Sequence, residues 1–147
     1  MRHARGVNVR TYEPSDALAL GRLLGEMGYA TSTEQAAEHA RGFLARPGAT
    51  LLVAVVEDAV VGMAASFLVP RLDVDVLSCR ITDLVVAAAS RRRGIGRELM
   101  VEIETRARDA GATRLDLSTG DWRGEAHAFY EHLGFIYNAR ALLRRIG

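Results

Sequence analysis

The sequence predicts a single domain of mixed α/β class, spanning residues 1–147. Strand and helix patterns alternate along the chain: one strand, two helices, a run of three strands, and then helix, strand and helix before a final strand region. This order is typical of mixed α/β folds. A length of 147 residues fits one domain, and hydrophobic residues, at 49%, are numerous enough to form a core.

Each element is predicted from its apolar periodicity and its flanking residues. Strands are expected over residues 7–12, 51–56, 60–69, 77–86 and 113–118, with one or two more in residues 135–145; helices are expected over residues 14–27, 31–46, 94–110 and 124–133. Pro14 suits the start of the first helix, and Gly28 and Gly111 suit helix ends. Residues 57–59 form the turn of a hairpin. Residues 1–6 are expected to be frayed.

A short basic loop with two glycines separates the strand at 77–86 from the helix that follows. It reads Arg91-Arg92-Arg93-Gly94-Ile95-Gly96, and we call residues 91–96 the basic loop. Glycine lets the backbone approach a ligand closely, while a helix start offers unpaired N–H groups and a positive dipole end. This combination predicts a pyrophosphate-binding site.

The spacing distinguishes three kinds of pyrophosphate site. A nucleotide triphosphatase loop needs Lys and then Ser or Thr after its second glycine, but Arg97-Glu98 follows Gly96. A dinucleotide fold needs a third glycine where Leu99 stands. The third pattern, Arg/Gln-x-x-Gly-x-Gly/Ala after a Leu-x-Val strand, fits in full, with residues 84–86 as Leu-Val-Val. It resembles motif A of the GNAT family of N-acetyltransferases, which bind acetyl-CoA.

A second signature lies downstream, in family order. Ala126, Phe129, Tyr130 and the pair Gly134-Phe135 resemble the family's second motif, Asn-x-x-Ala-x-x-Phe-Tyr-x-x-x-Gly-Phe. Arg123 departs from it, since many members have Asn at that position. The resemblance runs from about Val7 to the C-terminus. It implies a GNAT fold, with a central, mostly antiparallel mixed sheet that splays at the cofactor site and carries helices on both faces.

The resemblance also implies where acetyl-CoA binds. Backbone N–H groups of residues 92–97 would take the pyrophosphate, the pantetheine arm would lie along residues 84–86, and the Val86 amide would donate to the thioester carbonyl. The residues assigned to the cofactor on this basis are Leu84, Val85, Val86, Arg91, Arg92, Arg93, Gly94, Ile95, Gly96, Arg97, Arg123 and Phe129.

Two residues are assigned to catalysis. A phenol is protonated at neutral pH, since its reference pKa is near ~10, and Tyr130 stands where the family places a tyrosine that protonates the leaving thiolate. The alternative is a structural tyrosine packed beside Phe129. For the general base, the sequence leaves several candidates. Asp83 is the one carboxylate in an apolar strand, where an unpaired charge is costly. It could bind the substrate ammonium group, anchor a water that takes the proton, or pair with an arginine.

Further candidates for the base are Asp116, Ser118 and an ordered water without a dedicated base. His127, three residues before Tyr130, is a weaker site candidate. The segment Leu117-Ser118-Thr119, Arg123 and His127 together resemble the aminoalkylphosphonate N-acetyltransferases and related bacterial enzymes. This narrower resemblance implies a small primary amine, and Arg71, Arg80 or Arg123 could meet an anionic group on it.

The function expected is therefore acetyl transfer from acetyl-CoA to a small amine, by direct attack in a ternary complex. One alternative is a protein acetyltransferase acting on an N-terminus or lysine, whose substrate groove could use Asp73 and Asp75. The other is a non-catalytic acyl-CoA-binding domain.

Composition excludes several other classes. A net charge of +1 argues against a dedicated nucleic-acid-binding protein. The four histidines have no metal-ligand spacing, so no metal is expected. Cys79 is the single cysteine, which suits a reducing compartment, and we expect it to be a strand residue rather than a nucleophile. Neither a signal peptide nor a membrane span is evident, so we expect a cytoplasmic enzyme without membrane partners and with a possible homodimer.

Overall fold

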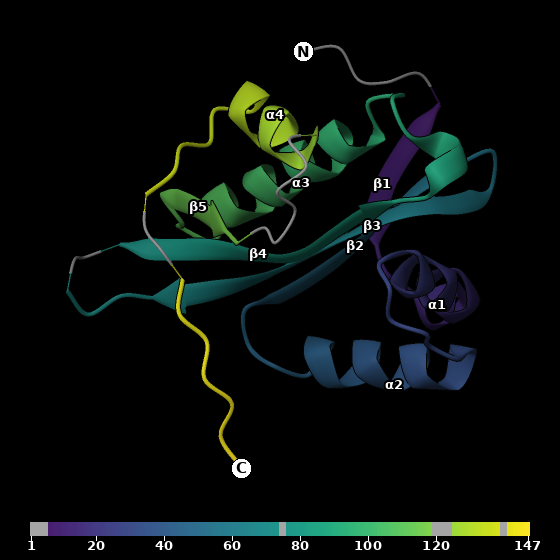
Figure 1. The fold of residues 1–147 in the computed structure, drawn as a ribbon, viewed down its shortest axis with the longest axis horizontal. Helices are drawn as coiled ribbons and strands as arrows, with labels where there is room; N and C mark the ends of the chain where they lie inside the picture. The colour runs from purple at the N-terminus through teal and green to yellow at the C-terminus, as the bar shows by residue number, and fades with distance from the viewer. Residues whose placement is uncertain (1–5, 74–75, 119–124, 139–140) are drawn as a thin grey trace. The chain divides into compact units, whose positions relative to one another are not determined.

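The computed structural model describes residues 6–73, 76–118, 125–138 and 141–147 (Figure 1). The chain divides into two compact units, of which the first ends at Asp116 and the second begins at Leu117. The strands are β1 (Val7–Thr11), β2 (Ala49–Val56), β3 (Ala59–Pro70), β4 (Leu77–Val86) and β5 (Arg114–Leu117); the α-helices are α1 (Ala17–Glu26), α2 (Thr33–Leu44), α3 (Ile95–Asp109) and α4 (Glu125–His132). Each confirms an element expected from the sequence, with ends shifted by a few residues at most.

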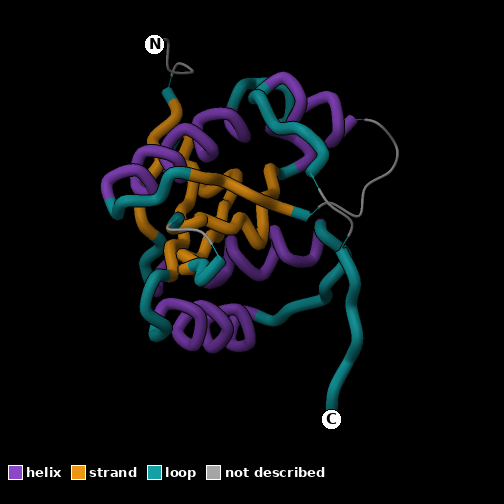
Figure 2. Tube along the Cα trace, turned by 90° about the vertical axis from the view of Figure 1, so that its left-hand side faces the viewer, coloured by secondary structure: helices purple, strands orange, loops and turns teal. Residues whose placement is uncertain are grey.

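The five strands form one sheet in the order β1-β2-β3-β4-β5. Three neighbouring pairs, β1–β2, β2–β3 and β3–β4, are antiparallel, and the sheet is mixed because of the pairing of β4 with β5. Helices α1 and α2 cover one face of the sheet and α3 covers the other (Figures 1 and 2). The expected α+β fold is therefore confirmed.

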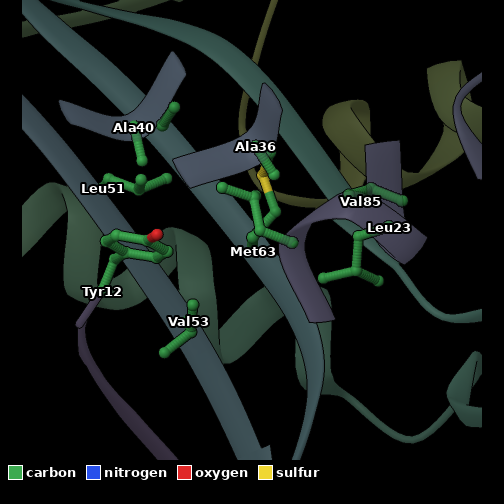
Figure 3. Close-up of a cluster of buried hydrophobic side chains, with 10 residues drawn as sticks. Tyr12, Leu23, Ala36, Ala40, Leu51, Val53, Met63 and Val85 are labelled. Atoms are coloured by element: carbon green, nitrogen blue, oxygen red, sulfur yellow. The ribbon is translucent and has the colours of Figure 1, made fainter. Parts of the chain in front are cut away.

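Strand β2 lies between two helical layers, and its sequence reflects this position. Residues 51–54 read Leu-Leu-Val-Ala, and all four are buried. A strand buried on both faces has a continuous apolar run rather than alternation. Leu51 and Val53 belong to the hydrophobic cluster under α1 and α2 (Figure 3). Alternation of side chains along a strand directs Leu52 to the other face, where α3 packs.

The first helix is anchored by an ion pair to β1. The Arg10 guanidinium donates two hydrogen bonds to the Asp16 carboxylate, at 2.8 and 2.9 Å, and the Glu13 amide donates a third, at 2.8 Å. Asp16 is buried and ends the 3-10 turn Pro14–Asp16 that leads into α1. The hydrogen bonds from Arg10 hold the pKa of Asp16 below its ordinary value of 3.8.

This lowered pKa predicts a pH-dependent contribution to stability. Because the pKa is lower in the folded state, the contribution is present above about pH 4 and is lost as the pH falls through the folded-state pKa. Asp16→Asn should lower the free energy of unfolding by about 1.5–3 kcal/mol at pH 7. Chemical denaturation of both proteins between pH 7 and pH 3 should show the difference shrinking. A difference that stays constant over this range would contradict the assignment.

The described residues of the range 135–145 form no strand, so the expectation of one or two final strands there was wrong. In the described residues 135–138 and 141–147 the backbone is irregular, and Ile136, Leu142 and Leu143 are exposed. A strand is stabilised by a hydrogen-bonded neighbour and by burial of its apolar face, and apolar composition alone supplies neither.

Within the described part of the chain, no helix is long and apolar enough to cross a membrane.

Candidate active site

Strand β4 positions the residues assigned to acetyl-CoA and to the general base. Its pairing with β3 runs from Pro70 opposite Leu77 to Gly62 opposite Val86. The register shifts once, because the consecutive residues Ala65 and Ser66 face Asp83 and Ile81. Thr82 is therefore the extra residue of a β-bulge. Bulges bend a strand, increase its twist and change the direction of the side chains that follow.

Asp83 comes directly after the bulge, on the face of the sheet covered by α1 and α2. It lies opposite Ala65 and two residues before Val85, and both belong to the hydrophobic cluster of that face. The side chain is half-buried. Among the described residues, no hydrogen bond or ion pair reaches its carboxylate. A half-buried carboxylate without a partner is available to a ligand.

The end of β4 extends beyond its short neighbour β5. The Thr113 amide donates to the Leu77 carbonyl at 3.1 Å, and Asp116 accepts hydrogen bonds from Ser78 and Arg80. Strand β5 therefore lies beside the first half of β4 and ends one residue after Asp116. This leaves the backbone of residues 84–86 past the end of β5, as a splayed sheet requires.

The basic loop bends sharply between β4 and α3. Arg92 and Gly94 both have left-handed backbone conformations, with φ of 65° and 78°. Gly94 is the N-cap of α3, and glycine adopts this conformation without steric cost, whereas Arg92 does not. Arg91, Arg92, Arg93 and Arg97 are all exposed, so their charges surround the start of the helix. The N–H groups of the first turn have no acceptor within the helix.

Buried residues fix α3 against the sheet. Ile95 and Leu99 are almost fully buried, and they lie over Gly62 of β3. A Cβ at Gly62 would lie 3.2 Å from Leu99 Cδ1 and 3.2 Å from the Val85 carbonyl oxygen. The absence of a side chain here allows α3 to pack close to β4, where Val86 is the register partner of Gly62. The helix start and the end of β4 are thereby held together.

Helix α4 belongs to the second unit, and its residue Tyr130 is part of an aromatic cluster. The Tyr130 ring packs edge-on against Phe129, with ring centres 5.2 Å apart, and against Phe135 at 5.8 Å. Gly134, with a φ of 92°, ends the helix and lets the Phe135 amide donate to the Tyr130 carbonyl. The His127 ring instead lies 5.5 Å from the ring of Tyr137. Arg123 lies outside the described residues.

Comparison with known proteins decides the family. The model of the acetyltransferase (GNAT) family matches residues 19–135. The chain belongs to the GNAT family. GNAT N-acetyltransferases use acetyl-CoA, so this protein is an acetyl-CoA-dependent N-acetyltransferase. No curated protein sequence matches the chain.

Solved structures share the fold over nearly the whole chain. A putative acetyltransferase from Agrobacterium tumefaciens str. C58 has 29% identity and a TM-score of 0.85, covering 95% of this chain and 99% of that one. A ribosomal-protein-alanine N-acetyltransferase from Brucella melitensis biovar Abortus 2308 has 18% identity and a TM-score of 0.77, with coverage of 95% and 99%. An aminoglycoside N-acetyltransferase in complex with CoA has 13% identity and a TM-score of 0.82, with coverage of 95% and 94%. The last two show the fold alone.

Several charged and polar side chains near β4 bind one another in ion pairs and hydrogen bonds. The Arg80 guanidinium donates to Asp116 at 2.7 Å, and Ser78 donates to the same carboxylate at 2.8 Å. Arg71 makes two hydrogen bonds to Asp73, which raise the pKa of the arginine. These pairs cannot be read from the sequence, because their formation depends on side-chain geometry at the end of the sheet. They give Asp116 structural partners, whereas Asp83 has none in the described part of the chain.

Cys79 lies in a strand, as the sequence analysis predicted. Its thiol is buried in β4, with 1% of the residue exposed. Burial raises the pKa of the thiol, so it stays protonated and is a poor nucleophile at neutral pH.

Proposed function

We propose that this GNAT enzyme acetylates the primary amine of a small, cationic molecule by direct attack within a ternary complex. The observation that carries the proposal is the arrangement in the first unit. The carboxylate of Asp83, which has no partner among the described residues, and the exposed arginines of the basic loop lie at opposite ends of the segment 83–97. One end suits an ammonium group and the other suits a pyrophosphate.

Acetyl-CoA supplies a thioester-activated acetyl group, and this chain would bind and orient it. The left-handed turn at Gly94 directs the first-turn N–H groups of α3 toward a pyrophosphate, while the four exposed arginines supply positive charge. The Val86 amide would donate to the thioester carbonyl oxygen and stabilise the charge that develops there. The position of residues 84–86 past the end of β5 supports this role, since β5 does not occupy the edge of β4 along which the pantetheine arm would lie.

Two proton transfers complete the proposed reaction. The ammonium proton passes to Asp83, or through it to water, which leaves a neutral amine to attack the carbonyl carbon. As the C–N bond forms and the C–S bond breaks, the Tyr130 hydroxyl donates a proton to the thiolate. The first transfer is supported by the half-buried position of Asp83, whose carboxylate has no partner within the described ranges. The second is supported by the match of α4 to the family's second motif.

The charges near β4 favour a cationic acceptor over an anionic one. Arg71 and Arg80, which could have met an anionic group, are already paired with Asp73 and Asp116. This arrangement gives less support to an aminoalkylphosphonate acceptor than the sequence resemblance does. The negative charge of Asp83 has no such partner in the part of the chain that the structure describes, so polyamines and aminoglycosides are the preferred classes of acceptor.

An acceptor screen tests the proposal directly. Release of the CoA thiol should be measured with polyamines, aminoglycosides, aminoalkylphosphonates and peptides that carry a free N-terminus or lysine. We expect turnover with a small cationic amine. Turnover with peptides alone would establish a protein acetyltransferase instead. Acetyl-CoA binding without turnover on any acceptor would favour a non-catalytic acyl-CoA-binding domain.

The basic loop can be tested without knowing the acceptor. Gly96 lies in the first turn of α3, where a side chain would enter the space proposed for the pyrophosphate. Gly96→Asp adds bulk and a repulsive charge there, so acetyl-CoA affinity measured by calorimetry should fall by about tenfold or more. Gly42→Asp is a suitable control, because Gly42 is an exposed residue of α2 with open space around it. Unchanged affinity in a folded Gly96→Asp variant would refute the pyrophosphate assignment.

A further inference from the structure

The last residue of α1 contacts the segment that joins β4 to the basic loop. Glu26 Oε1 accepts a hydrogen bond from the Ala88 amide at 3.1 Å, across 62 positions in the sequence. Ala88 begins the short 3-10 turn Ala88–Ser90, and the first N–H groups of such a turn have no partner within it. Glu26 therefore supplies an acceptor that the local backbone does not provide.

Two other hydrogen bonds tie the segment after β4 to the strands. The Ala87 amide donates to the Val61 carbonyl of β3 at 2.7 Å, and Arg91 Nε donates to the Val86 carbonyl at 3.1 Å. The two consecutive amides after β4 are thus bonded to two different elements, Ala87 to β3 and Ala88 to α1. Removing either bond would leave the path from β4 into the basic loop less restrained.

The position of Glu26 in its own helix is electrostatically unfavourable. The C-terminal end of a helix carries partial negative charge, so a carboxylate there is repelled. The last turn of α1 contains no basic residue that would offset this. The stability of α1 therefore does not explain a glutamate at this position, whereas the hydrogen bond to Ala88 does.

We infer that Glu26 is a positioning residue, which holds the segment between β4 and the basic loop in the conformation that binds acetyl-CoA. The inference rests on the proposed role of the basic loop. Helix α1 covers the face of the sheet that carries Asp83, and the basic loop leads to α3 on the other face. Glu26 thereby connects the helix layer on the proposed amine side to the proposed cofactor loop.

Two substitutions separate the hydrogen bond from the charge. Glu26→Gln and Glu26→Ala both remove the negative charge, but only glutamine retains an oxygen acceptor for the Ala88 amide. We expect calorimetry to show that the Ala variant binds acetyl-CoA about three- to tenfold more weakly than the Gln variant, the range that one net hydrogen bond allows. Hydrogen exchange at the Ala88 amide should be faster in the Ala variant alone. The melting temperature of the Gln variant should stay close to that of the parent, because this variant retains the hydrogen bond and loses only the unfavourable charge at the helix end.

A matched control and a second substitution make the outcome decisive. Glu38→Ala, in the exposed part of α2, removes a carboxylate that makes no hydrogen bond among the described residues, and it should leave acetyl-CoA affinity unchanged. If Glu26→Ala and Glu26→Gln bind acetyl-CoA equally well while Gly96→Asp weakens binding, Glu26 has no positioning role and the cofactor loop stands. If Gly96→Asp also leaves the affinity unchanged, the basic loop is not the cofactor site, and the inference about Glu26 falls with it.

Discussion

Tyr130→Phe should retain acetyl-CoA affinity and lower the rate of acetyl transfer by about 10²–10⁴-fold, the usual contribution of a general acid. The substitution removes only the hydroxyl. The phenyl ring can keep its edge-on contacts with Phe129 and Phe135, so the aromatic cluster and α4 should survive. The loss should therefore appear in kcat rather than in the melting temperature or in calorimetric binding of acetyl-CoA.

A matched control is available in the same unit. Tyr137 is exposed and its ring lies against His127 rather than against Tyr130. Tyr137→Phe removes an equivalent hydroxyl and should leave turnover unchanged. The comparison must be made at saturating acetyl-CoA, with pre-steady-state kinetics showing that chemistry limits the rate. Full turnover of Tyr130→Phe under those conditions would assign Tyr130 to the aromatic cluster alone.

Local sequence patterns predicted the part of the site that depends on local conformation. The strand at Leu77–Val86, the glycine-containing basic loop after it and the start of α3 were all expected, because glycine preference and apolar periodicity act over a few residues. The ends of α1 and of α3 were predicted for the same reason. What these patterns cannot predict is which distant groups meet.

Three features of the site depend on such distant contacts. The bulge at Thr82 exists only relative to its partner strand, since Ala65 and Ser66 define the register that it interrupts. The importance of Gly62 depends on α3 packing over it. The contact of Glu26 with Ala88 joins two elements that are far apart in the sequence. A glycine within an apolar strand was the one available signal, because it often marks close approach of another element.

The strands expected in residues 135–145 illustrate the opposite kind of error, in which a local pattern predicted an element that the described residues do not form. Residues 135–145 have an apolar composition that suits strands, yet the described residues of this region remain irregular, and Ile136, Leu142 and Leu143 are exposed. Strand propensity measures fit to a neighbouring strand and to a buried face, so it predicts a strand only where both exist. Residues 114–117 satisfy that condition beside β4, and the later segment does not.

Asp83→Asn should reduce amine turnover while acetyl-CoA binding is retained. Asparagine has the same shape but neither carries negative charge nor accepts a proton at neutral pH. If Asp83 binds the ammonium group, the loss should appear mainly in KM for the amine. If it removes the proton, kcat should fall by about 10²–10⁴-fold, and the acid-side limb of the pH–rate profile should change.

Asp116→Asn is the informative control for this substitution. Asp116 lies on the neighbouring strand, but its carboxylate is held by Arg80 and Ser78, so its loss should lower the melting temperature more than it alters turnover. Asp83 has no such partner among the described residues, and its substitution should have the opposite profile. If Asp83→Asn lowers the melting temperature and leaves both KM and kcat unchanged, Asp83 is a structural residue. Deprotonation of the amine would then fall to an ordered water rather than to a side chain of β4.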